Sequence, residues 1–107
     1  MTHVVHITEE AEKDLLDLWM YVATSDAAVK ADILLDRLEQ TCRDLARTPD
    51  RGHIPPELER LGIRAYREIH HTSYRVIYEV VGRDVFVYAV VDGRRDLQSF
   101  LERRLLR

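Results

Sequence analysis

The spacing of apolar residues changes from a helical period to a period of two near residue 63, and this change most restricts the fold. Before it, apolar side chains recur every three to four residues, as on one face of an amphipathic helix. They form two stripes: Ala11, Leu15, Leu18, Trp19 and Val22, then Ala31, Leu34, Leu35, Leu38, Cys42 and Leu45. Asp14 and Asp17 are expected on the opposite, polar face of the first helix. Two such helices with a short link should form a hairpin, because each stripe needs an apolar partner.

Capping residues predict where the two helices begin and end. Thr8 is a suitable N-cap, and the glutamates that follow it complement the helix dipole. The first helix should end near Ala23, and Ser25 or Asp26 should cap the second. The second helix should run to about Arg47, before a proline and a glycine stop it.

After Ile63, alternating apolar residues predict strands separated by short turns. The expected strands cover residues 64–70, 74–81 and 85–91. The last of these is apolar on both faces, which is typical of an interior strand covered on two sides. A short β-leaning run at residues 4–7 should add to one edge of the sheet.

The remaining segments are a long loop and a C-terminal helix. Residues 49–63 hold all three prolines and two of the four glycines, so a loop is expected there. Apolar spacing over 97–105 predicts a final helix that ends in a basic cluster, Arg103, Arg104 and Arg107. The predicted order is β-α-α-β-β-β-α, an α+β fold with a helical hairpin packed on a small antiparallel sheet. At 107 residues the chain is expected to form one domain, 1–107.

Cysteine usage and hydropathy bear on the compartment. The single cysteine, Cys42, cannot form an internal disulfide and falls at an apolar helical position, so it is expected to be buried. No apolar run approaches the roughly 20 residues of a membrane helix, and the chain does not open with a signal segment. These features predict a protein of the reducing cytoplasm with no membrane partner.

Charge is divided unevenly along the chain. Residues 1–50 carry five Lys/Arg against eleven Asp/Glu, whereas residues 51–107 carry eleven Arg against eight Asp/Glu. The first part therefore has a balance of −6 and the second a balance of +3. This asymmetry suggests two faces with different partners.

Several kinds of chemistry find no support in the motifs. His3 and His6 are three apart in a strand, and His70 and His71 are adjacent, so each pair points to opposite faces. No zinc or calcium motif is present, and no metal or other cofactor is expected. The serines lack a nucleophile-elbow context, and the scattered glycines form no phosphate-binding loop.

The sheet arginines are the remaining candidate site. They are Arg64, Arg67, Arg75, Arg94 and Arg95, and Arg67 and Arg75 lie on neighbouring strands where they could converge. Clustered guanidinium groups suit phosphate or carboxylate oxygens. The structural alternative is a set of cross-strand salt bridges to Glu68, Glu79, Asp92 and Asp96.

Five segments together resemble the RelE/ParE toxin superfamily of type II toxin–antitoxin systems, and the ParE-like branch in particular. They are ITEEAEKDL at 7–15 with Trp19 and Tyr21-Val22 behind it, LARTPDRG at 45–52, GIR at 62–64, YRVIYEV at 74–80 and DGRRDL at 92–97. They follow the superfamily's order over nearly the whole chain. The resemblance implies a toxin held inactive by an antitoxin encoded beside it.

The superfamily divides by mechanism. RelE-like members cut messenger RNA on the ribosome, and ParE-like members poison DNA gyrase. In the ribonuclease branch the matching arginines fall on Arg75 and Arg95. Other residues of that branch are replaced in this chain. Tyr66 and Glu68 stand where the branch has lysines, Leu101 where it has a C-terminal tyrosine, and Asp92 where several members have a histidine.

These departures favour gyrase over RNA as the target. Cleaving RNA needs a base, an acid and cations, and the usual proton-transfer groups are replaced. The net charge of −3 is also unsuited to docking into ribosomal RNA. The resemblance therefore implies a gyrase inhibitor that acts by binding and is not an enzyme.

Two alternatives remain. One is a ribosome-dependent endoribonuclease that uses Arg75, Arg95, Glu68 and His70; the other is a non-toxic antitoxin-binding module. Residues expected to bind the target or antitoxin are Arg64, Arg67, Arg75, Arg94, Arg95 and Trp19. Operator DNA is expected as a partner only through the antitoxin.

Overall fold

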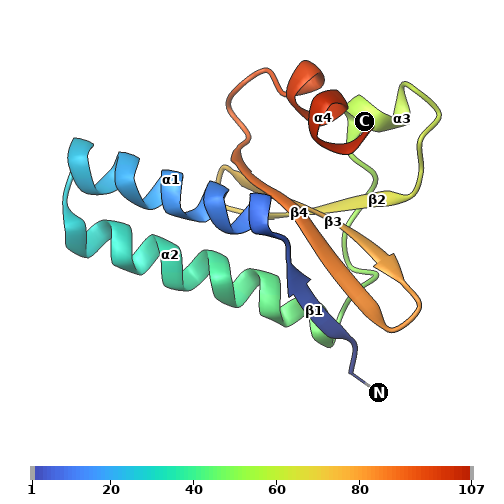
Figure 1. Cartoon of the computed structure of the whole chain (residues 1–107), viewed down its shortest axis with the longest axis horizontal. Coiled ribbons are helices and arrows are strands. Elements are labelled where there is room, and N and C mark those ends of the chain that lie inside the picture. The colour runs from blue at the N-terminus through green and yellow to red at the C-terminus, as the bar shows by residue number, and fades with distance from the viewer. Residues whose placement is uncertain (1, 107) are drawn as a thin grey trace.

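The computed structural model describes residues 2–106, and a helical hairpin extends from one side of its sheet (Figure 1). The predicted element order and α+β class are confirmed, with one helix added. In chain order the elements are β1 (Val4–Ile7), α1 (Glu9–Ser25), α2 (Ala28–Arg43), the 3-10 turn η1 (Asp44–Ala46), α3 (Pro56–Glu59), β2 (Tyr66–His71), β3 (Tyr74–Val81), β4 (Asp84–Asp92) and α4 (Gln98–Leu105). Two residues of the expected basic cluster, Arg103 and Arg104, lie in the last turn of α4, and Arg107 lies outside the described residues.

The sheet has the order β1-β4-β3-β2, so β4 is interior as its two apolar faces predicted. The three C-terminal strands form an antiparallel meander, and β1 joins its edge parallel to β4. The pairing register of β3 and β4 shifts where Tyr78 faces Val87 and Ile77 faces Ala89, which leaves Tyr88 as an extra residue. Such a bulge moves later side chains to the other face of the sheet.

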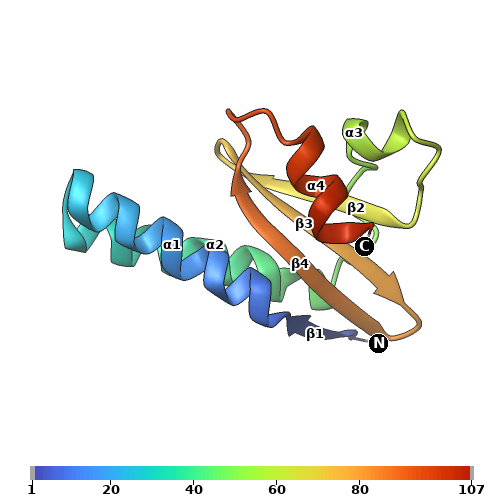
Figure 2. The same cartoon turned by 45° about the horizontal axis from the view of Figure 1, so that its top comes forward.

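Helices cover both faces of this sheet (Figure 2). One core lies between the hairpin and the sheet, and includes Ala11, Leu15, Leu38, Cys42, Leu45, Ile69, Val76, Tyr78, Val85, Val87 and Val90. The second lies under α3 and α4, and includes Leu58, Ile77, Ala89, Val91, Leu97 and Leu101. The bulge explains why Val85 and Val87 belong to the first core and Ala89 and Val91 to the second.

The predicted caps were right for α1 and wrong for α2. Thr8 Oγ1 accepts a hydrogen bond from the backbone N–H of Ala11 at 3.2 Å. The N-cap of α2 is Ala27, which offers no side-chain bond. Ser25 still belongs to α1 and donates to the carbonyl of Tyr21, and Asp26 forms an exposed ion pair with Lys30. Both predicted caps therefore lie at the end of α1, before α2 begins.

The segment predicted as a loop holds the short helix α3, so that prediction was wrong over residues 56–59. Pro56 occupies the first turn of α3, and Gly62 beyond it has a φ of +75°. Proline at a helix start and glycine in the left-handed region after its end are terminal signals that fit this short helix. None of the helices within residues 2–106 combines the length and apolar character needed to cross a membrane.

Candidate functional site: an ion cluster and a groove

Arg75 on β3 is held by two carboxylates on the sheet face covered by α3 and α4. Its Nε and Nη2 donate to Glu68, the latter at 3.0 Å. Its Nη1 and Nη2 donate to Glu57 at 2.7 and 2.8 Å. The exposed fractions of the three side chains are 10% for Arg75, 13% for Glu57 and 1% for Glu68. We call these three residues the Arg75 cluster.

Two histidines complete the surroundings of Glu68. His70 Nε2 lies 2.9 Å from Glu68 Oε1, and His53 Nε2 lies 3.2 Å from Oε2. The two imidazole rings meet edge to face with centroids 5.5 Å apart. Each oxygen of the buried carboxylate thus faces the guanidinium on one side and an imidazole on the other.

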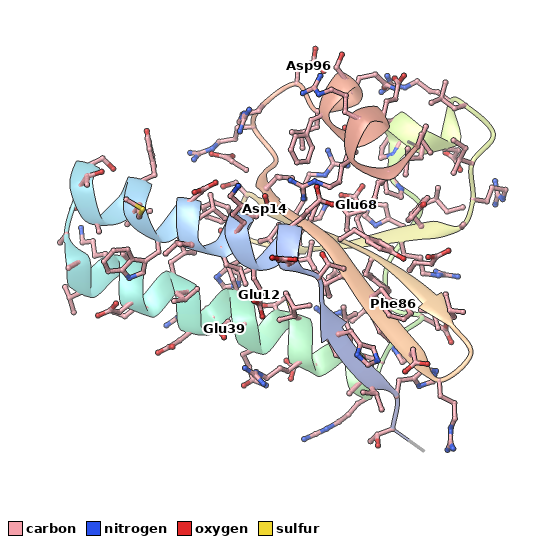
Figure 3. The ribbon with its side chains drawn as sticks, in the orientation of Figure 1. Glu12, Asp14, Glu39, Glu68, Phe86 and Asp96 are labelled. Carbon is pink, nitrogen blue, oxygen red and sulfur yellow. The ribbon has the colours of Figure 1, made fainter. Side chains whose placement is uncertain are left out.

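The local fold fixes these positions. His70 pairs directly with Arg75 across β2 and β3, and Glu68 lies two residues earlier on the same face. Glu57 comes from α3, which packs over the sheet face that bears Glu68 (Glu68 is labelled in Figure 3). Gly93 lies so close that a Cβ there would come 2.8 Å from Arg75 Cδ and 2.7 Å from the Ser73 carbonyl oxygen. The glycine of the DGRR segment therefore makes room for the arginine stem.

The electrostatics of the cluster follow from these contacts. Hydrogen bonds from Arg75 hold the pKa of Glu57 below its usual range, against the opposing effect of burial. The hydrogen bonds that Arg75 donates to Glu57, with those that it donates to Glu68, raise the pKa of Arg75 in turn, against the opposing effect of burial. One guanidinium faces two carboxylates, so the Arg75 cluster has a formal charge of −1. Both bidentate edges of the guanidinium are thus occupied by carboxylates of the protein itself.

Of the four candidates for RNA cleavage, three lie together. The strand arginines Arg67 and Arg75, in contrast, lie apart. Glu68, His70 and Arg75 form one hydrogen-bonded group. Arg67 faces the hairpin side of the sheet, where its Nη1 donates to the Gly52 carbonyl at 2.8 Å. The predicted convergence of Arg67 with Arg75 was wrong, because their positions on β2 and β3 place them on opposite faces.

The other predicted binding residues lie at the surface or between helices. Arg64 is 70% exposed and 3.8 Å from Glu59. Arg94, also 70% exposed, pairs with Asp92 at 2.7 Å, which lowers the pKa of that carboxyl. Trp19 Nε1 donates to Asp32 at 2.8 Å and so links α1 to α2.

Arg95, the fourth ribonuclease candidate, lines a groove bounded by α1, β4 and α4. The groove has a volume of about 560 Å³. Its lining combines apolar and acidic side chains with two arginines: Asp14, Asp17, Leu18, Tyr21, Val90, Val91, Asp92, Arg95, Phe100 and Arg104. Tyr21 on α1, one of these lining residues, is 69% exposed. We call this surface the α1–α4 groove.

Asp14 was expected on a solvent-facing surface and is instead 12% exposed at the floor of this groove. It accepts a hydrogen bond from the backbone N–H of Val90 at 3.0 Å, and Arg104 donates to it at 2.9 and 3.1 Å (Figure 3 labels Asp14). β1 pairs with β4 only as far as Val87, so the backbone beyond needs other partners. Asp14 and Arg104 supply them.

Among the site residues that sequence reasoning missed are His53, Glu57 and Arg104. His53 and Glu57 come from the segment read as a loop, whose path across β2 no periodicity encodes. The proline at the start of α3 and the glycine after its end could have predicted the helix. They could not have predicted where it packs on the sheet. Arg104 was read only as part of a basic cluster. Its partner is 90 positions away in the sequence.

Comparison with known proteins agrees with the fold and places the chain in a family. A family profile described as "ParE toxin of type II toxin-antitoxin system, parDE" matches residues 5–97. This chain therefore belongs to the ParE toxin family, which confirms the predicted resemblance. No curated protein sequence matches the chain.

Solved structures share the fold at low sequence identity. A chain of the chromosomal ParDE toxin–antitoxin system from P. aeruginosa matches with a TM-score of 0.72 and 13% identity, covering 85% of this chain and 96% of that chain. A chain of the toxin–antitoxin complex RelBE2 from Mycobacterium tuberculosis matches with a TM-score of 0.63 and 20% identity, covering 86% of this chain and 99% of that one. Both comparisons support the RelE/ParE-like architecture.

Proposed function

We propose that this chain is a ParE-like toxin of the cytoplasm that inhibits DNA gyrase by binding, without a catalytic reaction of its own. The main support for the proposal is that Arg75, the arginine that matches the ribonuclease branch, is already paired with carboxylates of the same chain. Its side chain is 10% exposed, and the guanidinium donates to Glu57 and Glu68 through all three nitrogens. A messenger RNA phosphate would have to displace a carboxylate that is already paired in the free protein. Such a displacement is costly, because it leaves a buried charge without its partner.

The antitoxin is proposed to occupy the α1–α4 groove with an amphipathic segment that carries basic and apolar side chains. Asp17 and Asp92 line the groove, and the hairpin half of the sequence is the acidic one. Tyr21, 69% exposed, offers an aromatic surface at the rim. Aromatic residues of this kind commonly anchor helix-in-groove contacts.

Ribosome-dependent RNA cleavage is the second candidate, and one observation favours it. Glu68, His70 and Arg75 lie in one group, so a base, an acid and a cation come together. Arg95, which the same mechanism would use, lines the α1–α4 groove instead. Arg75 and Glu68 of this set are buried, and Arg75 is already paired with Glu57.

A gyrase supercoiling assay tests the proposal. Purified protein is titrated into reactions with relaxed plasmid, and trapped cleaved DNA is measured after protein digestion. We expect loss of supercoiling with accumulation of cleaved DNA, reversed by the protein encoded in the adjoining reading frame. Normal supercoiling at every concentration would contradict the gyrase target. If that protein still bound tightly, the non-toxic binding module would be the better account.

The groove is tested separately by antitoxin binding. Tyr21→Ala should weaken the affinity about tenfold or more, because an exposed aromatic anchor is lost. Val81→Ala is a matched control, since Val81 is a 51% exposed apolar residue at the end of β3, away from the groove lining. Equal affinities for both variants would place the antitoxin elsewhere on the toxin.

A further inference from the structure

His53, Glu68 and His70 present three potential metal ligands from two segments of the chain. We propose that these residues form a binding site for a divalent transition-metal ion, with Zn²⁺ as the ion that the donor set fits best. Two imidazole nitrogens and one carboxylate are a common set of zinc ligands, and they leave a fourth position open. The proposal is independent of gyrase inhibition.

The distances are close to those that such an ion requires. The three donor atoms all lie within 4.8 Å of one another. His70 Nε2 and His53 Nε2 already lie 2.9 and 3.2 Å from the two oxygens of Glu68. Donors around a tetrahedral zinc are about 3.3 Å apart, given metal–ligand distances of about 2.0–2.2 Å. Closing the site therefore needs a movement of the imidazoles only, and these are 62% and 49% exposed.

The backbone holds all three ligands in position. His53 and Glu68 face each other in an isolated bridge, with N···O distances of 3.1 and 2.7 Å in the two directions. His70 lies two residues after Glu68 on the same face of β2. A Cβ on Gly52, next to His53, would lie 2.6 Å from the Glu68 carbonyl oxygen. This close approach keeps the His53 segment against the strand.

The charge of the surroundings favours a bound cation. Arg75 is shared by Glu57 and Glu68, so the buried group keeps one formal negative charge after internal pairing. The two histidines now approach the Glu68 oxygens from the sides that Arg75 leaves open. A metal ion would use these same lone pairs. Arg75 would meanwhile orient the carboxylate from behind, as outer hydrogen bonds commonly do for metal ligands.

Isothermal titration calorimetry with ZnCl₂ tests the proposal on the full chain, after treatment with EDTA and buffer exchange. We expect one Zn²⁺ per chain, and a loss of affinity of about tenfold or more in both His53→Ala and His70→Ala, since each removes a ligand. His6→Ala is the matched control, because His6 Nε2 also contacts a carboxylate, Asp84 at 2.8 Å, and is 45% exposed. This variant should bind Zn²⁺ as the wild type does.

A thermal melt with and without Zn²⁺ provides a second readout and checks folding. Zn²⁺ should raise the midpoint of the wild type and of His6→Ala, because the ion would tie the segment before α3 to β2. His53→Ala should still melt cooperatively, and its midpoint should gain nothing from Zn²⁺. Absence of Zn²⁺ binding by the wild type would overturn the proposal, leaving a hydrogen-bonded His–Glu–His group. Undiminished binding by both single variants would also overturn it.

Discussion

Arg75 and Arg94 illustrate how one type of ion pair differs in two environments. Each guanidinium donates through Nε and Nη2 to the two oxygens of one carboxylate, Glu68 for Arg75 and Asp92 for Arg94. Arg75 is 10% exposed and has Glu57 as a second partner, whereas Arg94 is 70% exposed and pairs with Asp92, two residues earlier at the end of β4. Because Arg75 is buried and has a second carboxylate partner, it maintains the fold, whereas Arg94 remains accessible.

The difference decides what each arginine can offer a partner. A buried charge that loses its partner is strongly destabilised, because water cannot replace the lost contact. An exposed pair exchanges with water and salt at little cost. Arg94 is therefore available to another protein, and Arg75 is not. The sequence suggested that Arg75 and Arg94 belong to one arginine site. The structure shows that the first is paired in the interior and the second is accessible at the surface.

Substitution of Arg75 should give the largest effect. Arg75→Leu leaves Glu57 and Glu68 facing each other without a cation, and we expect a loss of about 3–5 kcal/mol in the free energy of unfolding. Urea denaturation followed by circular dichroism measures this loss. Arg67→Leu is a suitable control on the opposite sheet face, where only hydrogen bonds to backbone carbonyls are removed. Its cost should be about 1 kcal/mol, and equal losses would mean that the buried carboxylates are not the cause.

Glu57→Gln should have a smaller effect that depends on pH. The pKa of Glu57 is lowered in the folded protein, so its ionised form stabilises the fold above its ordinary value of 4.5. That contribution is lost as the pH falls through the lowered pKa. The stability difference between wild type and variant should be largest near neutral pH and shrink below pH 4.5. Urea melts across this range test the prediction, and a constant difference would contradict a role for the charge.

Arg94→Ala should have the smallest effect on stability. The side chain is 70% exposed, and its carboxylate partner Asp92 stays at the end of β4 where water can solvate it. We expect a urea midpoint indistinguishable from that of the wild type. A clear loss of stability would show that the pair supports the fold, and would remove the contrast with Arg75.

The main elements of this fold were readable from local patterns. The helical stripes, the change of period near residue 63 and the Thr8 cap all reflect contacts between near neighbours in sequence. The strand 74–81 was predicted to the residue, because its apolar run is bounded by turn residues on both sides. The parallel pairing of β1 with β4 was outside such reasoning, since only the edge position could be inferred.

The residues that surround Arg75 and Asp14 were harder to predict from the sequence than the fold was. Arg75 and Glu68 were identified as candidates, but the partner Glu57 lies 18 positions from Arg75 in a segment without periodicity. The face on which Arg67 lies depends on the pairing of β2 with β3, which sequence spacing alone did not give. Asp14 was misplaced because its partners are 76 and 90 positions away. Long-range pairing and helix docking determine these contacts, and single-sequence patterns do not record them.

Message cleavage in a coupled translation reaction tests whether the Arg75 cluster belongs to the fold or is an RNA-cleaving centre. Wild-type protein is added at concentrations that inhibit supercoiling, and the message is mapped by primer extension, with Arg75→Lys as the charge-conserving comparison. We expect full-length message in both reactions, because Arg75 is paired within the fold in the free protein. Cuts produced by the wild type and absent with a folded Arg75→Lys variant would contradict this expectation.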